Sequence, residues 1–419
     1  MSDHAIDPLD LEALVTEARA LYAARRPQSR REHEAARVHL PGGNTRSVLH
    51  FEPFPYRVVG ADGAVQTDAD GHTYVDLCGN YTAGLFGHSA SAVRAAVVAA
   101  LDTGFSIGGI RAQEAELAGL LCRRFPSLEQ VRFTNSGTEA NLLAVGTALH
   151  HTSRSGVLVF DRGYHGGVLS FGGVGGSESP LNAPYDITVA EFDRIDSAVR
   201  RIESRRYGCV LVEPVQGSGG CRVADVEFLR ALRSSCDQTE TVLIFDEVMT
   251  SRLSDAGAQG HFGVTPDMTT LGKYLGGGMS FGAFGGRRPI MRHFDPGQGG
   301  LLGQAGTFNN NAASIGAAIA VLTEVLTTKA LRTVNDRGER LRAGLNDTFS
   351  RHEQNLWATG LGSMLCLHAA RPQQLELLFF HLLECGFFVA PRGFISLSFE
   401  VTDGHVDEFL AAVEEWCGP

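Results

Sequence analysis

Apolar residues follow two different spacings along the chain, and the two kinds of segment alternate from about residue 90 to residue 320. Short apolar runs have the length of buried strands, and the predicted strands cover residues 131–135, 157–160, 187–192, 209–215, 242–247, 268–272 and 282–285. The longer segments have helical spacing, and the predicted helices cover residues 91–102, 112–124, 138–150, 195–205 and 225–236. Because such alternation produces a mostly parallel sheet covered on both faces, the pattern predicts an α/β fold with a large domain over residues 76–320.

The flanking segments have a different pattern. Residues 9–37 have helical spacing, and residues 58–77 alternate between apolar and polar positions around two Asp-Gly turns, which is typical of a small antiparallel sheet. An Ala-rich helix after residue 310 leads to a second block, whose predicted elements are helices 334–350, 372–385 and 403–417 and strands 362–368 and 394–399. We therefore expect an N-terminal arm with a small antiparallel segment over residues 1–75. Residues 321–419 are expected to form a small C-terminal α+β domain that the N-terminal segment could join.

Composition and charge restrict the class of protein. The 419 residues are 43% hydrophobic and 20% charged, as in a globular protein, and the net charge of −11 argues against nucleic-acid and anionic membrane partners. The eight cysteines are scattered, without a C-x-x-C pair or a Cys/His cluster of zinc spacing, so we expect free thiols in a reducing compartment and no metal site. The N-terminal segment is acidic and amphipathic, unlike a signal peptide, and no apolar run is long enough to span a membrane. These features predict a cytoplasmic protein.

The stretch from residue 241 to residue 278 carries the first candidate chemistry. A buried strand ends on Asp246 and Glu247, and a second short run ends at Lys273, before three glycines. In an open α/β sheet, ligands bind beyond the carboxyl ends of the strands, so Asp246 and Lys273 can face one ligand. Pyridoxal 5'-phosphate needs that pair, because a lysine holds it as a Schiff base and a carboxylate keeps its ring nitrogen protonated. Alternatively, the aspartate only caps a helix and the lysine is a solvated loop charge. A P-loop is disfavoured because its lysine is followed by Ser or Thr, whereas Tyr274 follows Lys273 here.

Two further strand ends carry polar motifs. In RFTNSGTEANLL a strand runs into Ser136, Gly137 and Thr138 and then into a helix, and Ser136 and Glu139 have capping-box spacing. A helix start with exposed N–H groups and hydroxyls suits a phosphate, although it can also be an ordinary cap. In CVLVEPVQGSGG, Gln216 is a candidate hydrogen-bond donor to the hydroxyl of the cofactor's pyridine ring. Glu213 in the same motif is expected to support the site without contacting the ligand.

The loop motif YHGG places Tyr164 after another strand, where an aromatic ring can stack on a planar ligand or simply pack. Taken together and in this order, SGTEAN, YHGG, VEPVQG, LIFDEVMTSR, TLGKYLGGG, FGAFGGR and AGTFNNN resemble the class III aminotransferases of the fold-type I pyridoxal-phosphate superfamily, over roughly residues 38–415. Within that class the chain resembles the glutamate-1-semialdehyde aminomutase branch. Its PGGNTRSV and PRGF motifs are most similar to those of the β-amino-acid (β-phenylalanine) aminotransferases.

The resemblance implies a fold and a set of roles. The fold is that of a fold-type I transferase, in which a large domain with a mostly parallel seven-stranded sheet is joined to a smaller α+β domain. Lys273 would bind the cofactor and move the proton, and Asp246 would pair with the pyridinium. The remaining cofactor contacts would come from Ser136, Gly137 and Thr138 at the phosphate, Val248 and Tyr164 on the two ring faces, Gln216, and Thr307 in the phosphate site of the neighbouring subunit of a homodimer.

The resemblance also implies a substrate class. Arg46 in PGGNTRSV and Arg392 in PRGF would bind carboxylates, although either arginine could instead form a surface ion pair. The expected reaction transfers an amino group from a β-amino acid to an oxo acid such as 2-oxoglutarate or pyruvate. Residues 105–116, with Arg111, depart from the β-phenylalanine enzymes, so aromatic specificity stays open. The rival functions are an aminomutase, which moves an amine within one molecule, and a cofactor-binding regulatory protein.

Overall fold

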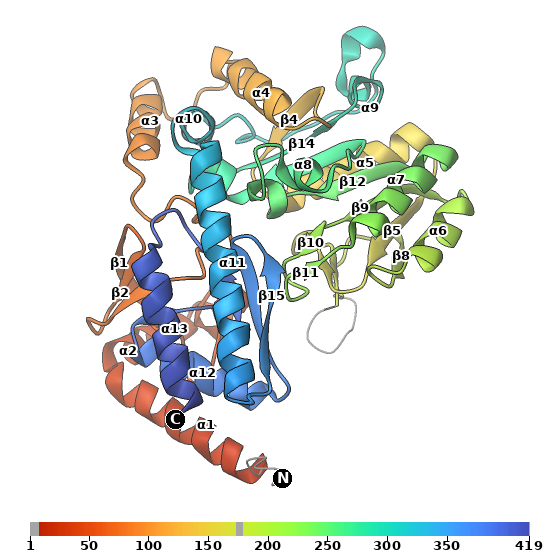
Figure 1. Ribbon diagram of the computed structural model, residues 1–419. Coiled ribbons are helices and arrows are strands. Elements are labelled where there is room, and N and C mark those ends of the chain that lie inside the picture. Colours follow the sequence, from red (N-terminus) through yellow and green to blue (C-terminus); the bar gives the residue numbers. More distant parts are fainter. Residues whose placement is uncertain (1–7, 173–178, 419) are drawn as a thin grey trace. The chain divides into compact units, whose positions relative to one another are not determined.

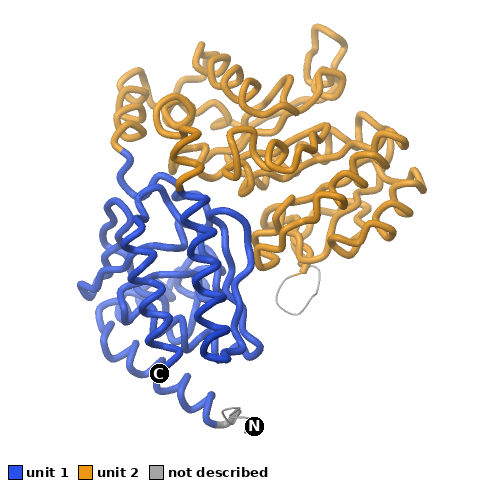
Figure 2. The backbone as a smooth tube through the Cα atoms, viewed as in Figure 1, with its two compact units in different colours: residues 1–90, 334–419 blue, residues 91–333 orange. Residues whose placement is uncertain are grey.

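The computed structural model describes residues 8–172 and 179–418, so the first seven residues of the predicted arm lie outside the described part. The chain forms two compact units, residues 91–333 and residues 1–90 with 334–419 (Figure 2). These limits differ from the predicted boundaries after residues 75 and 320. The N-terminal and C-terminal segments belong to one unit because they share a sheet. This unit, residues 1–90 with 334–419, is the smaller of the two.

The larger unit is built on a seven-stranded sheet (Figure 1). In spatial order its strands are β4 (Gln130–Thr134), β14 (Gly282–Gly286), β13 (Met268–Gly272), β12 (Val242–Asp246), β9 (Tyr207–Val212), β5 (Gly156–Phe160) and β8 (Asp186–Ala190). Only β14 runs antiparallel to its neighbours in this sheet. The predicted mostly parallel seven-stranded sheet is confirmed.

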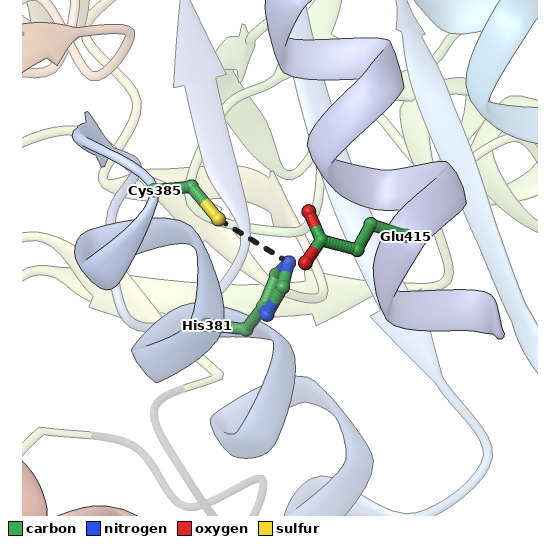
Figure 3. Close-up of side chains that lie close together, drawn as sticks. All are labelled: His381, Cys385 and Glu415. Atoms are coloured by element: carbon green, nitrogen blue, oxygen red, sulfur yellow. Dashed lines mark hydrogen bonds between the residues drawn. The ribbon is translucent and has the colours of Figure 1, made fainter.

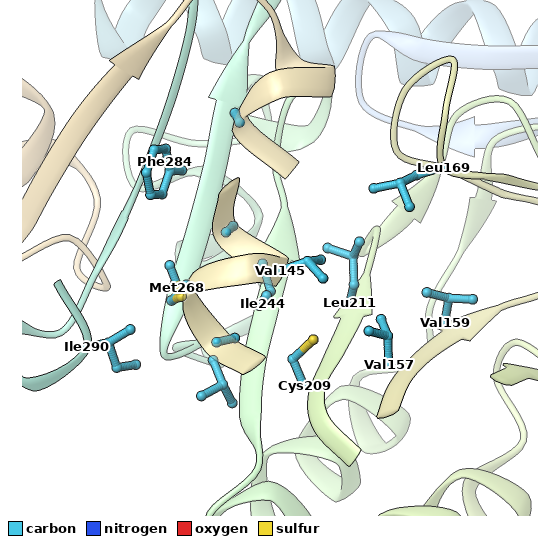
Figure 4. Packing of buried hydrophobic residues seen from close by; sticks show 14 of the residues in the cluster. Val145, Val157, Val159, Leu169, Cys209, Leu211, Ile244, Met268, Phe284 and Ile290 are labelled. Atoms are coloured by element: carbon cyan, nitrogen blue, oxygen red, sulfur yellow. The ribbon is translucent and has the colours of Figure 1, made fainter. Parts of the chain in front are cut away.

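Both faces of this sheet are buried, and strand alternation divides its side chains between two cores. On β12, Val242 and Ile244 join a core with helix α5 (Gly137–Thr152) (Figure 4). Leu243 and Phe245 join the opposite core with α6 (Ile195–Glu203) and α7 (Val226–Thr239). Because each face needs apolar side chains, the strand sequence is continuously apolar instead of alternating.

Further helices of the larger unit are α3 (Ser91–Asp102), α4 (Ala112–Arg124), α8 (Gly257–Phe262), α9 (Arg288–Met291) and α10 (Ala312–Ala320). The predicted helices 91–102 and 112–124 are confirmed. The predicted strand 209–215 is wrong at its end: β9 stops at Val212, and residues 215–216 form β10, which pairs with β11 (Arg222–Val223). Pro214 interrupts the strand because it lacks the N–H that a ladder needs. A second hairpin, β6 (Gly163–Tyr164) with β7 (Ser170–Phe171), was also not predicted.

The smaller unit contains a four-stranded sheet that joins the two ends of the chain. Its strands are β1 (Val58–Asp62), β2 (Val65–Asp68), β3 (Thr73–Asp76) and β17 (Phe387–Phe388), and β17 pairs parallel to β3. A three-stranded antiparallel sheet contains β15 (Leu356–Leu361), β16 (Met364–Ala369) and β18 (Phe394–Ser396). Helix α11 (Thr328–Arg351) from residue 334 on, α12 (Pro372–Glu384) and α13 (Asp403–Cys417) complete the C-terminal part. The predicted helix 403–417 is confirmed, whereas β15 was missed.

The predicted helical segment 9–37 divides into α1 (Pro8–Arg25) and α2 (Pro27–Arg37). The division falls at Arg26 because Pro27 cannot continue the hydrogen bonding of α1 but suits a first helical turn. Arg26 is fully buried: its Nη1 donates to Glu384 Oε1 at 2.8 Å and its Nε donates to the Tyr74 hydroxyl at 3.0 Å. This arginine therefore ties the N-terminal helices to both β3 and α12.

All eight cysteines lie among the described residues, and no disulfide links them. Within the described ranges, no helix is by itself long and apolar enough to cross a membrane. One sharply bent pair, Ala312–Val325 with Thr328–Arg351, meets the length and composition requirement only when its two arms are taken together.

Gly282 allows the closest backbone approach next to the start of α5. A Cβ at this position would clash with the Ser136 carbonyl oxygen and the Thr134 hydroxyl. Gly282→Ala is therefore expected to destabilise the protein by about 1–3 kcal/mol, as overpacking does. Gly60→Ala, also in a strand but with no atom within 4 Å, is the matched control and should melt like the wild type. Thermal melts that were the same for both variants would contradict this steric account.

Candidate active site

The site begins at the carboxyl ends of two neighbouring strands. Asp246 is the last residue of β12, and Lys273 directly follows β13. The two strands are parallel, with Asp246 opposite Thr270, so both residues leave the sheet at the same edge. Lys273 has a left-handed backbone (φ 52°), which is unusual for a residue with a side chain and is typical of positions constrained by function.

Strand alternation separates the two acids that end β12. Asp246 continues the face of Val242 and Ile244 and therefore points toward α5. Glu247 points to the opposite face, where its carboxylate accepts hydrogen bonds from the backbone N–H groups of Ala258 and Gln259 in α8. Burial raises the pKa of Glu247 to about 7. Its hydrogen-bonding capacity is used within the fold, which leaves Asp246 as the acid available at the site.

Asp246 is almost completely buried and is held from three sides. Its Oδ2 accepts from Asn141 Nδ2 at 2.8 Å and lies 2.9 Å from His165 Nδ1, while its Oδ1 accepts from the Val248 N–H at 3.0 Å. The Thr270 hydroxyl donates to Asn141 Oδ1 at 2.7 Å and thereby fixes that amide. The sequence analysis assigned no role to Asn141 or Thr270. The available signal was helical spacing, since Asn141 lies one turn after Gly137 on the face of α5 that packs on the sheet.

His165 and Glu213 extend this buried network. Burial acts to lower the pKa of His165, but the hydrogen bond with Asp246 and the negative charge of Asp246 outweigh it and raise the pKa above its ordinary value. Glu213 accepts from the backbone N–H groups of Tyr164 at 2.9 Å and Gly217 at 3.2 Å. Burial, followed by the charge of Asp246, raises the pKa of Glu213 to about 7. The environment of Asp246 is therefore poor in water and rich in titratable groups.

Ser136, Gly137 and Thr138 form the start of α5, as predicted. Ser136 is the N-cap, and its hydroxyl accepts from the Glu139 N–H at 3.2 Å. The predicted capping box is incomplete, because the Glu139 carboxylate accepts from the Asn135 N–H, one residue before the N-cap. The first N–H groups of a helix lack partners within the helix, so this start can bind an anion.

Glycines let three backbone segments approach one another beside Lys273. A Cβ on Gly137 would lie 2.8 Å from Val248 Cγ2, and a Cβ on Gly272 would lie 3.5 Å from the Gly137 nitrogen. The start of α5, the turn after β12 and the end of β13 thus lie close together. Gly166 in the YHGG motif is equally restricted, because a Cβ there would collide with the side chain of Thr138.

Gln216 differs from its predicted role in one respect. Its Nε2 donates to the Asp161 carbonyl at 2.8 Å. Its buried Oε1 has no hydrogen-bond partner among the described residues. The sequence suggested a donor to a ligand hydroxyl, whereas the structure leaves an acceptor open, so a ligand hydroxyl would donate to Gln216.

The other predicted cofactor residues are more exposed. The Tyr164 side chain is exposed, Val248 is half-buried, and Thr307 is exposed within the single chain. Thr307 lies in the segment that follows Gln304, whose amide donates to the Phe133 carbonyl on β4. The exposure of Tyr164 and Thr307 leaves both side chains available to a ligand or to a second subunit.

The two predicted substrate arginines lie in the smaller unit, where both border Tyr81. Arg46 donates to Asn80 Oδ1 at 2.6 Å, and its guanidinium lies 5.6 Å from the centre of the Tyr81 ring. The Tyr81 ring stacks on Phe394, next but one to Arg392, with ring centres 5.6 Å apart. Burial raises the pKa of Tyr81, while the positive charges of Arg392 and Arg46 act in the opposite direction. The sequence analysis missed Tyr81.

The segment that carries Tyr81 has an unusual backbone. Asn80, Tyr81 and Thr82 all have positive φ, at 46°, 54° and 76°. Such conformations cost on the order of 1–3 kcal/mol each for residues with side chains and are concentrated at functional sites. The segment is fixed at its base, because the Asp76 carboxylate accepts from the backbone N–H of Gly79 at 3.0 Å.

A family model described as aminotransferase class-III matches residues 49–416. The chain belongs to the class-III aminotransferase family. This aminotransferase is 45% identical to the beta-phenylalanine transaminase of Variovorax paradoxus, over 94% of its own chain and 93% of that protein. A solved β-phenylalanine aminotransferase from the same organism matches with a TM-score of 0.94 and 43% identity over 97% of both chains. The chain is also 32% identical to a glutamate-1-semialdehyde 2,1-aminomutase of Lachnoclostridium phytofermentans, over 91% of this chain and 97% of that one.

The cofactor of the aminotransferase follows from its family. A solved transaminase with bound pyridoxal phosphate is 30% identical, with a TM-score of 0.86 over 94% of this chain and 97% of that one. Class-III aminotransferases use pyridoxal phosphate, and this protein is a pyridoxal-phosphate-dependent aminotransferase of fold type I, as the sequence predicted. The residues present fit that group: a helix start for its phosphate, a buried carboxylate for its ring nitrogen and an open acceptor on Gln216 for its hydroxyl.

The raised pKa of His165 gives the aminotransferase a testable pH dependence. A folded-state pKa above the unfolded value of about 6.5 means that the charged imidazole stabilises the fold fully below that pH. This contribution is lost as the pH rises through the folded-state pKa. His165→Asn keeps a donor for Asp246 but does not titrate, so its Tm deficit should be largest near pH 6 and shrink toward about pH 9. The exposed His39→Asn variant is the control; a deficit independent of pH in His165→Asn would contradict the assignment.

Proposed function

We propose that this enzyme transfers an amino group from a β-amino acid to an oxo acid such as 2-oxoglutarate or pyruvate. The observation that carries the proposal is the placement of Arg46 and Arg392 around Tyr81, which provides two guanidinium groups at one aromatic ring. The 45% identity to a beta-phenylalanine transaminase supports the same substrate class.

Lys273 and Asp246 are the proposed catalytic residues. When bound, pyridoxal phosphate supplies an aldehyde that takes up the donor's amine and a cationic ring that withdraws electrons. Lys273 would hold the cofactor at rest, and its free amine would take up the proton from the donor carbon and release it to the cofactor. Asp246 keeps the ring nitrogen protonated. Asn141 and His165 hold that carboxylate in place from the side of α5.

The remaining contacts position the cofactor. Ser136, Gly137 and Thr138 bind the phosphate through the N–H groups and hydroxyls of the start of α5. Val248 and Tyr164 would pack on the ring, and the open Gln216 oxygen would accept from the ring hydroxyl. The exposed Thr307 reaches the phosphate site of a neighbouring subunit, so the working enzyme is a homodimer, which we place in the cytoplasm.

The two arginines allow one site to accept two kinds of acid. A β-amino acid carries its carboxylate one carbon farther from the reacting amine than an α-amino acid does. One arginine cannot hold both carboxylates in the same geometry, because guanidinium–carboxylate pairing is planar and bidentate. We assign Arg46 and Arg392 to different substrates, the β-amino acid donor and the oxo-acid acceptor. The guanidinium of Arg111 donates to Oγ1 of Thr103, just after α3, at 3.2 Å and has no assigned role.

An aminomutase is the second candidate, favoured by the 32% identity to a glutamate-1-semialdehyde aminomutase. An aminomutase moves the amine within one molecule and needs no oxo-acid acceptor. A transaminase with two carboxylate sites turns over only when both a donor and an acceptor are present. Dependence on the acceptor therefore separates the two activities.

Lys273→Ala should abolish transamination and remove the visible absorption band of the bound cofactor. Lys329 is the only other lysine in the sequence, and Lys329→Ala is therefore the matched control, expected to retain both properties. Borohydride reduction followed by peptide mapping should place the cofactor on the peptide that contains Lys273. Transamination by Lys273→Ala, or labelling of the Lys329 peptide, would refute the assignment.

A donor screen tests the proposed substrate. Both enantiomers of several β-amino acids, and α-amino acids as controls, are assayed with 2-oxoglutarate and with pyruvate. We expect turnover of β-amino acids that requires an acceptor. Arg46→Ala and Arg392→Ala should each raise the KM of a different carboxylate substrate by roughly 10- to 100-fold, as loss of a charged hydrogen bond of about 1.5–3 kcal/mol implies.

Two outcomes of the screen would count against the proposal. Turnover without any acceptor would favour the aminomutase. Unchanged KM values in both arginine variants, for every acid tested, would show that the carboxylates bind elsewhere.

A further inference from the structure

Three side chains of the smaller unit form a cluster that the aminotransferase reaction does not use. His381 lies in the last turn of α12, Cys385 is the C-cap residue directly after this helix, and Glu415 lies in the last turn of α13. One ligand atom from each residue lies within 4.8 Å of the other two. Figure 3 shows the thiol and the carboxylate gathered at the same end of the imidazole ring. We propose that His381, Cys385 and Glu415 bind a divalent transition-metal ion, with Zn²⁺ as the best fit.

The spacing of the nitrogen and sulfur atoms agrees with zinc coordination. Zn–N and Zn–S bonds of about 2.0 and 2.3 Å at a tetrahedral angle place the two ligand atoms about 3.5 Å apart. The distance between His381 Nε2 and Cys385 Sγ is 3.4 Å. The separation of the two atoms therefore matches a shared ion, and the i, i+4 spacing of His381 in α12 and Cys385 at its C-cap keeps them close.

The chemistry of the ligands favours zinc over harder ions. A thiolate, an imidazole and a carboxylate form a mixed sulfur, nitrogen and oxygen set that suits Zn²⁺, whereas Mg²⁺ and Ca²⁺ prefer oxygen ligands. Three protein ligands leave the fourth position for a water molecule. The site would be electrically neutral, because the thiolate and the carboxylate balance the ion, which suits a half-buried position.

The local electrostatics also attract a cation. The carboxylates of Glu415 and Glu384 lie close enough to the Cys385 thiol to act on it electrostatically. Glu415 is exposed, so an ion can enter from solvent, while His381 and Cys385 are half-buried. The thiol at rest is protonated; on binding, the Zn–S bond replaces the S–H bond and the proton passes to solvent.

The imidazole must also change its hydrogen bond. His381 Nε2 lies 2.9 Å from the Ala412 carbonyl oxygen, which is its partner in the absence of metal. On binding, Nε2 gives up its proton and coordinates the ion, while Nδ1 takes up a proton from solvent, so the ring stays neutral. The Ala412 carbonyl lies inside α13 and keeps its intrahelical hydrogen bond, so it is not left without a donor. A bound ion would thus join α12 to the end of α13.

Metal titrations of the tag-free holoenzyme test the proposal. After removal of metals with a chelator, Zn²⁺ is titrated against a chromophoric chelator, and Co²⁺ is added separately to report thiolate ligation by its visible absorption. We expect one tight ion per chain. Cys385→Ser, His381→Gln and Glu415→Gln should each weaken binding by roughly 10- to 100-fold or more. Cys417→Ser, which changes another half-buried cysteine on α13, should leave binding unchanged.

A measurement on the unmodified chain covers the case in which a variant fails to fold. Zn²⁺ should protect Cys385 from alkylation, as peptide mass spectrometry reports, without protecting Cys417. Absence of binding by the wild type, equal binding by the three variants, or equal protection of both cysteines would overturn the proposal. None of these outcomes affects the aminotransferase activity, because the cluster shares no residue with the proposed cofactor site.

Discussion

The buried negative charge of Asp246 is the interaction on which the candidate site depends. A carboxylate at this depth is stable only with hydrogen-bond donors around it, and loss of one partner of a buried charge typically costs about 3–5 kcal/mol. Asn141, His165 and the Val248 N–H supply those donors. Asn141 comes from α5, His165 from the loop after β6, and the Val248 N–H from the turn that continues β12, so the position of α5 and of that loop is tied to one functional group.

The same constraint explains why the two neighbouring acids behave differently. Asp246 and Glu247 are adjacent in the sequence, but pleating sends them to opposite faces of the sheet. Glu247 accepts hydrogen bonds from the backbone of α8 and so has a structural role. Asp246 contacts α5 and the loop that carries His165. A cationic ring at Asp246 would add a further favourable partner to a charge that the protein already holds in place. The donors that stabilise the buried carboxylate would therefore also orient the cofactor, because they fix the direction in which Asp246 faces its ring nitrogen.

Much of this arrangement could be predicted from the sequence, because the strongest signals are local. Continuous apolar runs predicted the sheet strands, and Asp-Gly turns predicted the β1–β3 segment. The roles of Asn141 and Thr270 were not predicted, because their partners are more than 100 residues away along the chain. Tyr81 was missed for another reason: left-handed backbone at non-glycine residues is imposed by tertiary packing and leaves little trace in the sequence. Strand β15 was missed because Gly360, with a φ of 132°, interrupts its pattern.

The His381, Cys385 and Glu415 cluster shows how the limit of local signals affects site prediction in general. The i, i+4 pair at the end of α12 is visible in the sequence, but two potential ligands at this spacing are common and do not define a site. The third ligand, Glu415, lies in the last turn of α13. It is close to the pair only because α13 packs beside α12. The sequence prediction of no metal site rested on spacing between neighbouring cysteines and histidines. That criterion cannot detect a ligand contributed by a separate helix, since packing of the smaller unit and not sequence proximity brings the three atoms together.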